Sequence, residues 1–193
     1  MGRDKALLPH PEGGTWLERS LLLMAGLGAP VTLLSRHPHH LALARALAAA
    51  PLPITAVPEP PPWEGPLLAL HRLMTLHPDR LLLLCPVDMP ALTAAVLHQL
   101  LAVARAEPTV IHLAHDGRRL QPLLGLYPSG APIRSSLAAA VAAGERRLQS
   151  WLEVQPSCSV SLDPRALRNV NRPEELDPPF RPLPDSAPAP APA

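Results

Sequence analysis

The chain has 193 residues, 47% of them apolar and 3% aromatic, so leucine and alanine must fill the core of one ordinary-sized domain. The formal net charge of +1 leaves no basic footprint for nucleic acid, and no apolar run reaches membrane-spanning length or opens the chain as a signal peptide. Cys85 and Cys158 lack a metal or redox spacing, so we expect a cytoplasmic, reduced protein.

Helical and strand patterns alternate along the chain. They predict helices over 16–27, 38–50, 66–76, 93–106, 131–143 and 146–154, and strands over 30–35, 52–57, 81–84, 110–114, 121–127 and 159–162. Thr15 and Glu18 have the spacing of a capping box, and Thr93 is the natural cap of the fourth helix. We therefore expect a three-layer α/β/α domain with a mostly parallel sheet.

Turn residues and composition indicate one hairpin within the domain and the position of its C-terminal boundary. Asp116-Gly117 is a hairpin signal, which predicts an antiparallel strand at one side of the sheet. The domain is expected to span residues 1–176, with a turn leading into a last helix after Asn169. From 177 to 193 the chain is mainly Pro, Ala, Asp and Ser, and we expect it to be disordered because it cannot bury a core.

Three histidines cluster before the second predicted helix, at His37, His39 and His40. A metal site is one interpretation, but no carboxylate or cysteine stands near enough in sequence to complete it. A solvated loop is the interpretation that we adopt.

The segment around which the domain is organised runs from 81 to 90 and reads Leu-Leu-Leu-Leu-Cys-Pro-Val-Asp-Met-Pro. Four leucines in a row predict a strand buried on both faces of the sheet. Asp88 follows its carboxyl end, where open α/β sheets place their ligands, and a carboxylate there can hold Mg²⁺ against a phosphate. The alternative is that Asp88 caps the next helix, for which Thr93 is better placed.

Several short motifs occur together in a fixed order. They are Met-Gly-Arg-Asp-Lys-Ala-Leu-Leu at 1–8, Gly-Pro-Leu at 65–67, Cys-Pro-Val-Asp-Met-Pro at 85–90, Gln-Pro-Leu at 121–123, Asn-Val-Asn at 169–171 and Pro-Glu-Glu-Leu at 173–176. As an ordered set they closely resemble the molybdenum cofactor guanylyltransferases, within the MobA-like nucleotidyltransferases of Rossmann-like fold.

The resemblance implies a reaction and a set of partners. The terminal phosphate of molybdopterin would attack the α-phosphate of GTP, releasing pyrophosphate and forming a guanine dinucleotide, with Mg²⁺ as cofactor. The chemistry asks mainly for charge neutralisation and alignment of two anions. Molybdenum-insertion and molybdoenzyme maturation proteins are implied as partners, no nucleic acid or membrane is expected, and we expect a monomer.

The same resemblance implies roles for particular residues. Lys5 and Asp88 would be catalytic and bind the nucleotide, together with Glu59 and Gly65, and Asp4 would fix the loop that carries Lys5. The remaining implied residues are Asp88 and Asn171 for the metal, Gln121 and Asn169 for the pterin, and Arg146 and Arg147 for its phosphate.

Each of these roles has a structural alternative. Lys5 could be a surface lysine, Asn171 could order its loop, and Gln121 could have a structural role at a strand end. For Arg146 and Arg147, a solvated helix face is the interpretation that we prefer.

The chain also departs from the family pattern. Met1 aligns with a methionine inside the family motif, so the first strand and the Gly-rich phosphate loop are missing, and we expect that the start was assigned too late. Pro58 and Glu59 stand where the family has an aspartate, and Ala69 stands where it has a glycine. Two alternatives therefore stay open: cytidylyl or sugar-phosphate nucleotidyl transfer on the same fold, and a non-catalytic remnant that binds pterin or a molybdoenzyme.

Overall fold

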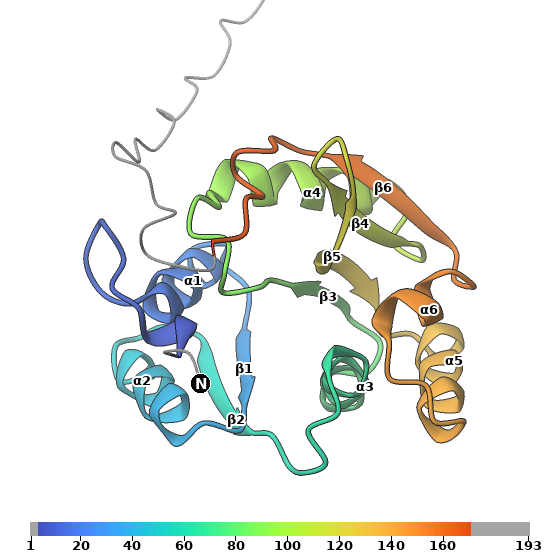
Figure 1. The fold of residues 1–193 in the computed structure, drawn as a ribbon, viewed down its shortest axis with the longest axis horizontal. Coiled ribbons are helices and arrows are strands. Elements are labelled where there is room, and N and C mark those ends of the chain that lie inside the picture. The colour runs from blue at the N-terminus through green and yellow to red at the C-terminus, as the bar shows by residue number, and fades with distance from the viewer. Residues whose placement is uncertain (1–3, 171–193) are drawn as a thin grey trace, which may run out of the picture.

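The computed structural model describes residues 4–170 (Figure 1). The helices are the 3-10 helix η1 (Lys5–Leu7) and the α-helices α1 (Trp16–Ala25), α2 (Pro38–Ala48), α3 (Pro66–Leu76), α4 (Ala94–Ala106), α5 (Ala131–Ala142) and α6 (Leu148–Leu152). The strands are β1 (Val31–Ser35), β2 (Ile54–Pro58), β3 (Leu81–Leu84), β4 (Ile111–His115), β5 (Leu120–Pro128) and β6 (Ser157–Ser161). Asn171, the expected last helix and the tail lie outside the described residues. None of the helices within 4–170 has the length and apolar character to cross a membrane.

The helix starts follow the local chemistry of the sequence. Thr15 Oγ1 accepts a hydrogen bond from Glu18 N at 3.2 Å, and the Glu18 carboxylate accepts one from Thr15 N at 2.6 Å, so the capping box is confirmed. Thr93 caps α4 by accepting from Val96 N at 3.4 Å. Because these caps satisfy amides that the first helical turn leaves unpaired, they define where α1 and α4 begin.

The strands form two sheets. β1 and β2 pair in parallel, and a four-stranded sheet has the order β3-β5-β4-β6. In the larger sheet β3, β4 and β6 run in one direction and β5 alone runs in the other, which confirms the mostly parallel sheet with one antiparallel strand.

The position of the antiparallel strand differs from expectation. The hairpin at Asp116-Gly117 is confirmed, with Gly117 at φ 88°, but β5 lies between β3 and β4 and not at one side of the sheet. Leu124 and Leu126 are buried along it, so a strand this apolar gains by having a neighbour on each edge as well as helices on its faces.

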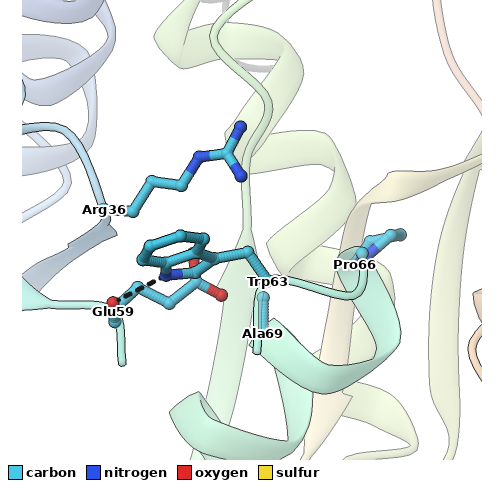
Figure 2. A pocket seen from close by; sticks show the side chains of 6 residues that line it. Arg36, Glu59, Trp63, Pro66 and Ala69 are labelled. Carbon is cyan, nitrogen blue, oxygen red and sulfur yellow. Dashed lines mark hydrogen bonds between the residues drawn. The ribbon is translucent and has the colours of Figure 1, made fainter. Parts of the chain in front are cut away.

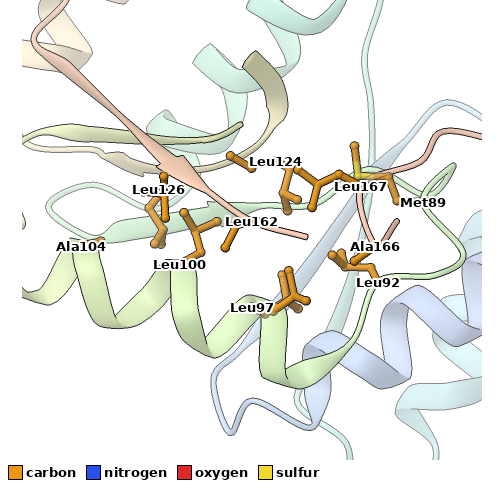
Figure 3. Packing of buried hydrophobic residues seen from close by; sticks show 13 residues of the cluster. Met89, Leu92, Leu97, Leu100, Ala104, Leu124, Leu126, Leu162, Ala166 and Leu167 are labelled. Carbon is orange, nitrogen blue, oxygen red and sulfur yellow. The ribbon is translucent and has the colours of Figure 1, made fainter. Parts of the chain in front are cut away.

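Helices cover both faces of the larger sheet. On one face α4 packs on residues of β4, β5 and β6, as Figure 3 shows for Leu97, Leu100 and Leu126. On the other face the helices α3, α5 and α6 enclose a second cluster around Tyr127. A third cluster joins α1, α2 and η1 to β1 and β2. The expected three-layer α/β/α arrangement is therefore confirmed.

The four leucines of β3 are less buried than the sequence predicts. Leu81 and Leu83 pack against the cluster under α4, whereas Leu82 and Leu84 pack against the cluster on the opposite face. All four nevertheless stay only half-buried. Within residues 4–170, β3 pairs only with β5 and β1 only with β2, so one edge of each strand has no strand beside it. The prediction of a fully buried strand is wrong for β3, because solvent reaches its side chains from the edge that has no neighbouring strand.

Candidate functional site

Asp88 lies in the loop that leaves β3, at the carboxyl end of the strand. In the part of the chain that the structure describes, no hydrogen bond or ion pair occupies its carboxylate, and α4 is capped by Thr93 instead. The alternative that Asp88 is a helix cap is therefore excluded. Its backbone oxygen accepts a hydrogen bond from Val170 N at 2.9 Å, which brings the segment containing Asn169 to the same loop.

Asn169 contributes a second oxygen to this region. Its Oδ1 atom is buried and has no hydrogen-bond partner among the described residues. A buried acceptor without a donor is costly in a folded protein, so this oxygen can take a ligand or a water molecule as its partner. Val170 itself packs with Leu8 and Trp16, so the segment containing Asn169 is held against the chain that follows η1.

The oxygen atoms of Asp88 and Asn169 fit a hard divalent cation. Mg²⁺ in nucleotide sites is held by one or two carboxylates and completed by water and substrate phosphates, not by a dedicated protein cage. Residues 4–170 contain no group of three or more His, Cys, Asp or Glu side chains able to hold a metal ion. The donor set therefore suits a metal that arrives with its nucleotide.

Lys5 is the only lysine in the chain, and it lies exposed in η1. The Asp4 carboxylate caps this turn by accepting from Ala6 N at 3.1 Å, which confirms the expectation that Asp4 fixes the loop. Ala6 packs in the cluster around β1 and β2, and Val87 packs against the same cluster. The direct neighbours of Lys5 and Asp88 therefore share one apolar environment.

A pocket of about 330 Å³ lies where β1 and β2 end and α3 begins (Figure 2). Its lining residues are Arg36, Glu59, Trp63, Gly65, Pro66 and Ala69. Trp63 is 50% exposed, and the Arg36 guanidinium lies over its indole ring at 5.4 Å from the ring centroid. The pocket brings together Glu59 and Gly65, two residues predicted to bind the nucleotide, and adds a flat aromatic surface with a cation above it.

Glu59 forms part of the wall of this pocket. Its carboxylate accepts from Arg72 Nη1 at 2.7 Å, in an ion pair whose side chains are 15% and 16% exposed. Arg72 also donates to the backbone oxygen of Pro62 at 2.9 Å, and Trp63 Nε1 donates to the Glu59 backbone oxygen at 3.0 Å. These bonds tie the proline-rich loop to α3, so the pocket is already shaped before a ligand enters.

Gln121 lies buried on β5, away from a free surface. Its side-chain amide donates to Asp116 Oδ2 at 2.8 Å within the hairpin. The backbone amides of Arg119 and Arg118, with Gln121 adding a further hydrogen bond, lower the pKa of Asp116 to about 2. These contacts support the structural role at the strand end, while contact between Gln121 and the pterin stays a prediction.

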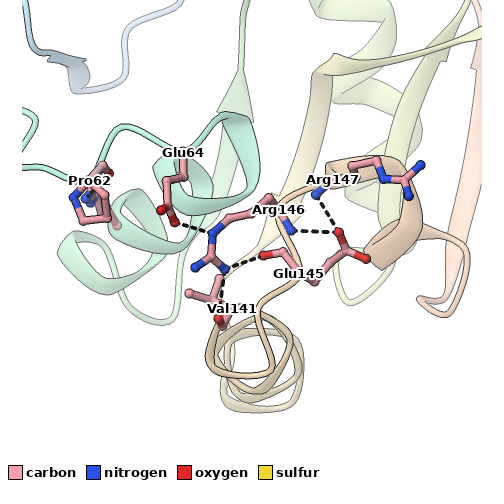
Figure 4. Close-up of polar contacts among 7 residues, drawn as sticks. Pro62, Glu64, Val141, Glu145, Arg146 and Arg147 are labelled. Atoms are coloured by element: carbon pink, nitrogen blue, oxygen red, sulfur yellow. Dashed lines mark hydrogen bonds and ion pairs between the residues drawn. The ribbon is translucent and has the colours of Figure 1, made fainter.

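Arg146 joins two loops beside the pocket (Figure 4). Its guanidinium forms an ion pair with Glu64 and donates to the backbone oxygens of Val141 at 3.1 Å and Glu145 at 2.8 Å. The expected solvated helix face is therefore wrong for Arg146, since α6 begins only at Leu148 and the side chain is fixed in the preceding loop. Glu145 accepts from the amides of Arg147 and Arg146, which lowers its pKa.

Sequence reasoning missed four residues near these segments: Arg36, His40, Trp63 and Arg72. His40 is buried in the first turn of α2, so the expected solvated histidine loop is wrong at this position. A signal was present, because His40, Leu41 and Ala44 form the buried stripe of the helix at helical spacing. The contacts of Arg36 and Arg72 join separate elements, which no local pattern reports.

Comparison with known proteins agrees with this geometry. The model of the MobA-like NTP transferase domain matches residues 1–160. The probable molybdenum cofactor guanylyltransferase of Rhodopirellula baltica is 35% identical over 187 residues, which cover 93% of this chain and 85% of that protein. The probable molybdenum cofactor guanylyltransferase of Mycobacterium tuberculosis is 32% identical over 190 residues, which cover 94% and 88%.

Two solved structures share the fold. The molybdopterin-guanine dinucleotide biosynthesis protein A of Archaeoglobus fulgidus superposes with a TM-score of 0.66 at 15% identity, over 91% of this chain and 88% of that one. The 2-C-methyl-D-erythritol 4-phosphate cytidylyltransferase of Thermus thermophilus superposes with a TM-score of 0.59 at 17% identity, over 89% and 90%. With the family match over most of its length and relatives above 30% identity, the chain belongs to the MobA-like NTP transferase family.

Proposed function

We propose that the protein transfers GMP from GTP to molybdopterin. An oxygen of the molybdopterin terminal phosphate attacks the α-phosphorus of GTP, the bond from that phosphorus to the β-phosphate oxygen breaks, and pyrophosphate leaves. Mg²⁺, when bound, supplies charge neutralisation between the phosphates. The names of the relatives, molybdenum cofactor guanylyltransferases, support this choice of substrates.

The observation that carries the proposal is the Asp88 loop. It presents a carboxylate that no other described group occupies, and the Asn169 segment lies beside it with an unpartnered buried oxygen. In nucleotidyl transfer the protein does little covalent work, so holding a cation and aligning two phosphates is the main requirement. Asp88, and Asn169 next to it, are the residues that we assign to this task, and Lys5 provides a further positive charge.

The pocket at Trp63 is the place that we assign to the base. A nucleobase can stack on an exposed indole, and an arginine above the ring contributes a cation–π contact. Glu59 would act there through the wall that it forms with Arg72, and Gly65 would let the ligand approach the start of α3.

The first test is binding of GTP, CTP and ATP in the presence of Mg²⁺, measured by calorimetry, followed by transfer to molybdopterin. Preferential GTP binding with pyrophosphate release supports the guanylyltransferase. Preferential CTP binding identifies a cytidylyltransferase on the same fold. Binding of none of the three nucleotides contradicts the proposal and favours a non-catalytic protein that binds pterin or a molybdoenzyme.

Asp88→Asn should abolish Mg²⁺-dependent transfer and leave the fold intact, because the amide keeps the shape of the side chain but loses the charge that attracts the cation. The measurement is pyrophosphate release, with circular dichroism as the check on folding. Asp79→Asn is the matched control, since it removes the same charge from a 74% exposed side chain in a turn with φ 56°, a conformation that asparagine adopts readily. Wild-type turnover in Asp88→Asn would remove this residue from the metal site.

Lys5→Ala should weaken GTP binding, because the positive charge that we assign to the phosphates is lost. Lys5→Arg keeps that charge and should bind more tightly than the alanine variant. Calorimetric affinities of the two variants and the wild type check this prediction. Equal GTP affinity in all three proteins would contradict the assignment of Lys5.

A further inference from the structure

His40, on α2, contacts the end of β1 and the turn at Asp4, which lies 36 residues away in sequence. It is 9% exposed, and its Nε2 atom lies 2.8 Å from Asp4 Oδ2 while its Nδ1 atom lies 3.0 Å from Ser35 Oγ. An ionised carboxylate can only accept a hydrogen bond, so Nε2 is the donor to Asp4. In the neutral ring, Nδ1 then accepts from the Ser35 hydroxyl.

The group contains Ser, His and Asp, but it lacks the properties of a hydrolytic triad. Ser35 is 7% exposed, and its Oγ atom also accepts from His37 N at 3.2 Å. A nucleophile must reach a substrate carbonyl or phosphorus, and this hydroxyl is enclosed at the end of β1. The bonds therefore serve to hold backbone segments in place.

The hydrogen bonds of His40 reach both the turn that carries Lys5 and the strand end beside the Trp63 pocket. Asp4 is bonded on both carboxylate oxygens, since Oδ1 accepts from Ala6 N and Oδ2 accepts from His40, so the turn that carries Lys5 is fixed on its capping residue. At the other end, Ser35 precedes Arg36, which lies over Trp63 in the pocket.

We propose that His40 is a positioning residue that holds the Asp4–Lys5 turn so that Lys5 meets the nucleotide phosphates. The proposal rests on the proposed nucleotide site, and it adds a residue on α2 that acts through Asp4. Asp4 is 39% exposed on its side chain and η1 is a single turn, so the bond from the buried His40 ring adds an anchor that the turn itself does not supply. We expect the removal of a hydrogen bond to a charged group of this kind to lower the affinity for GTP roughly tenfold.

The two ring nitrogens allow a matched pair of variants. In His40→Gln the amide nitrogen stands near the position of Nε2 and can still donate to Asp4. In His40→Asn the amide stands near the position of Nδ1 and can reach Ser35 but not Asp4. If His40 acts through Asp4, glutamine should preserve the positioning of Lys5, whereas asparagine and alanine should lose it.

The first measurement needs no nucleotide. Since Lys5 is the only lysine, its acetylation rate can be followed by mass spectrometry apart from the N-terminal amine. The rate should differ from the wild-type rate in His40→Asn and His40→Ala, because the surroundings of the Lys5 amine change when the turn is released, and stay near the wild-type rate in His40→Gln. Equal rates in the glutamine and asparagine variants, measured on proteins with the same thermal unfolding midpoint, would overturn the proposal.

The second measurement is the ratio of GTP to GMP affinity, which isolates the contribution of the outer phosphates. We expect the GTP preference to fall about tenfold in His40→Asn and to persist in His40→Gln, with no additional loss for His40→Ala in an Asp4→Asn background. A merely structural role would weaken GTP and GMP equally, and that result would overturn the proposal. If the wild type binds neither nucleotide but the acetylation rates still separate the variants, the proposed function fails while the anchoring of the turn stands.

Discussion

The strands of the larger sheet differ in burial, and the most apolar of them, β3, is not the most buried. In β4 and β5, Ile111, Leu113, Leu124 and Leu126 are at most 1% exposed, with a strand on both sides and helices on both faces. In β3 the four leucines of Leu81–Leu84 are all half-buried. The difference teaches that an apolar run specifies a strand, but that its burial depends on how many neighbours the sheet order provides.

The functional loop belongs to the less enclosed region. Asp88 follows β3, and the pocket lies at the ends of β1 and β2, so both parts of the proposed site are reached from strands with an unpaired edge within residues 4–170. Beside it, Leu113 of β4 and Leu126 of β5 are buried between the cluster under α4 and the cluster that contains α5. The proposed ligand contacts thus come from loops that follow partly exposed strands, where binding residues are commonly found.

The sharpest test of the comparison uses two leucines that face each other across β3 and β5, Leu83 and Leu126. Leu126→Ala should cost about 2–5 kcal/mol of unfolding free energy, because it leaves a cavity in the enclosed sheet. Leu83→Ala should cost about half as much, since part of that side chain already contacts water. Urea denaturation of both variants measures the difference, and equal losses would contradict the contrast between the strands.

A smaller effect is expected at Gly125, where β5 pairs with Leu113 of β4. A Cβ atom on Gly125 would lie 2.8 Å from the backbone oxygen of His112 and 2.9 Å from a methyl carbon of Leu113. Gly125→Ala should therefore destabilise the protein by about 1–3 kcal/mol, as overpacking does. Gly26→Ala, at the end of α1 with contacts of 3.4 Å or more, is the control and should change stability by less than about 0.5 kcal/mol. Thermal unfolding checks both, and similar midpoints would show that the strands can separate to accept the methyl group.

The smallest effect concerns reactivity and not stability. Burial, with a further contribution from the Asp88 carboxylate, raises the pKa of the Cys85 thiol to about 12, so this thiol stays protonated at pH 8. Cys158 on β6 is exposed. Iodoacetamide at pH 8 should therefore alkylate Cys158 first and leave Cys85 unmodified in the native protein. Rapid labelling of Cys85, measured by mass spectrometry, would show that the end of β3 is more accessible to solvent than its contacts indicate.

Local patterns predicted the elements well because each element begins or ends with short-range chemistry. The capping box at Thr15, Pro66 at the start of α3 and the Asp116-Gly117 hairpin all act between residues that are close in sequence. The motif around Asp88 likewise indicated the loop at the carboxyl end of β3, and the separate motif at Asn169 is joined to it by the Val170 hydrogen bond.

The errors concern contacts made at a distance. Nothing near Leu83 in the sequence reports that β3 has one strand neighbour, and nothing near the hairpin reports that β5 lies between two strands. His40 was assigned to solvent because its partners Asp4 and Ser35 lie on other segments. For Glu59 the sequence did not report the ion pair with Arg72 of α3, which holds its carboxylate in the wall of the pocket, and its contact with the nucleotide stays a prediction.

The sequence by itself determined the succession of helices and strands, the position of Asp88 after a strand, the single lysine at the start of the chain and the family to which these motifs belong. Periodicity, caps and turns act over a few residues, so they can be read locally. Only the tertiary structure decided the sheet order, the half-burial of β3, the pocket around Trp63 and the anchoring of Asp4 by His40, because burial and ion pairing depend on which distant segments the fold brings into contact.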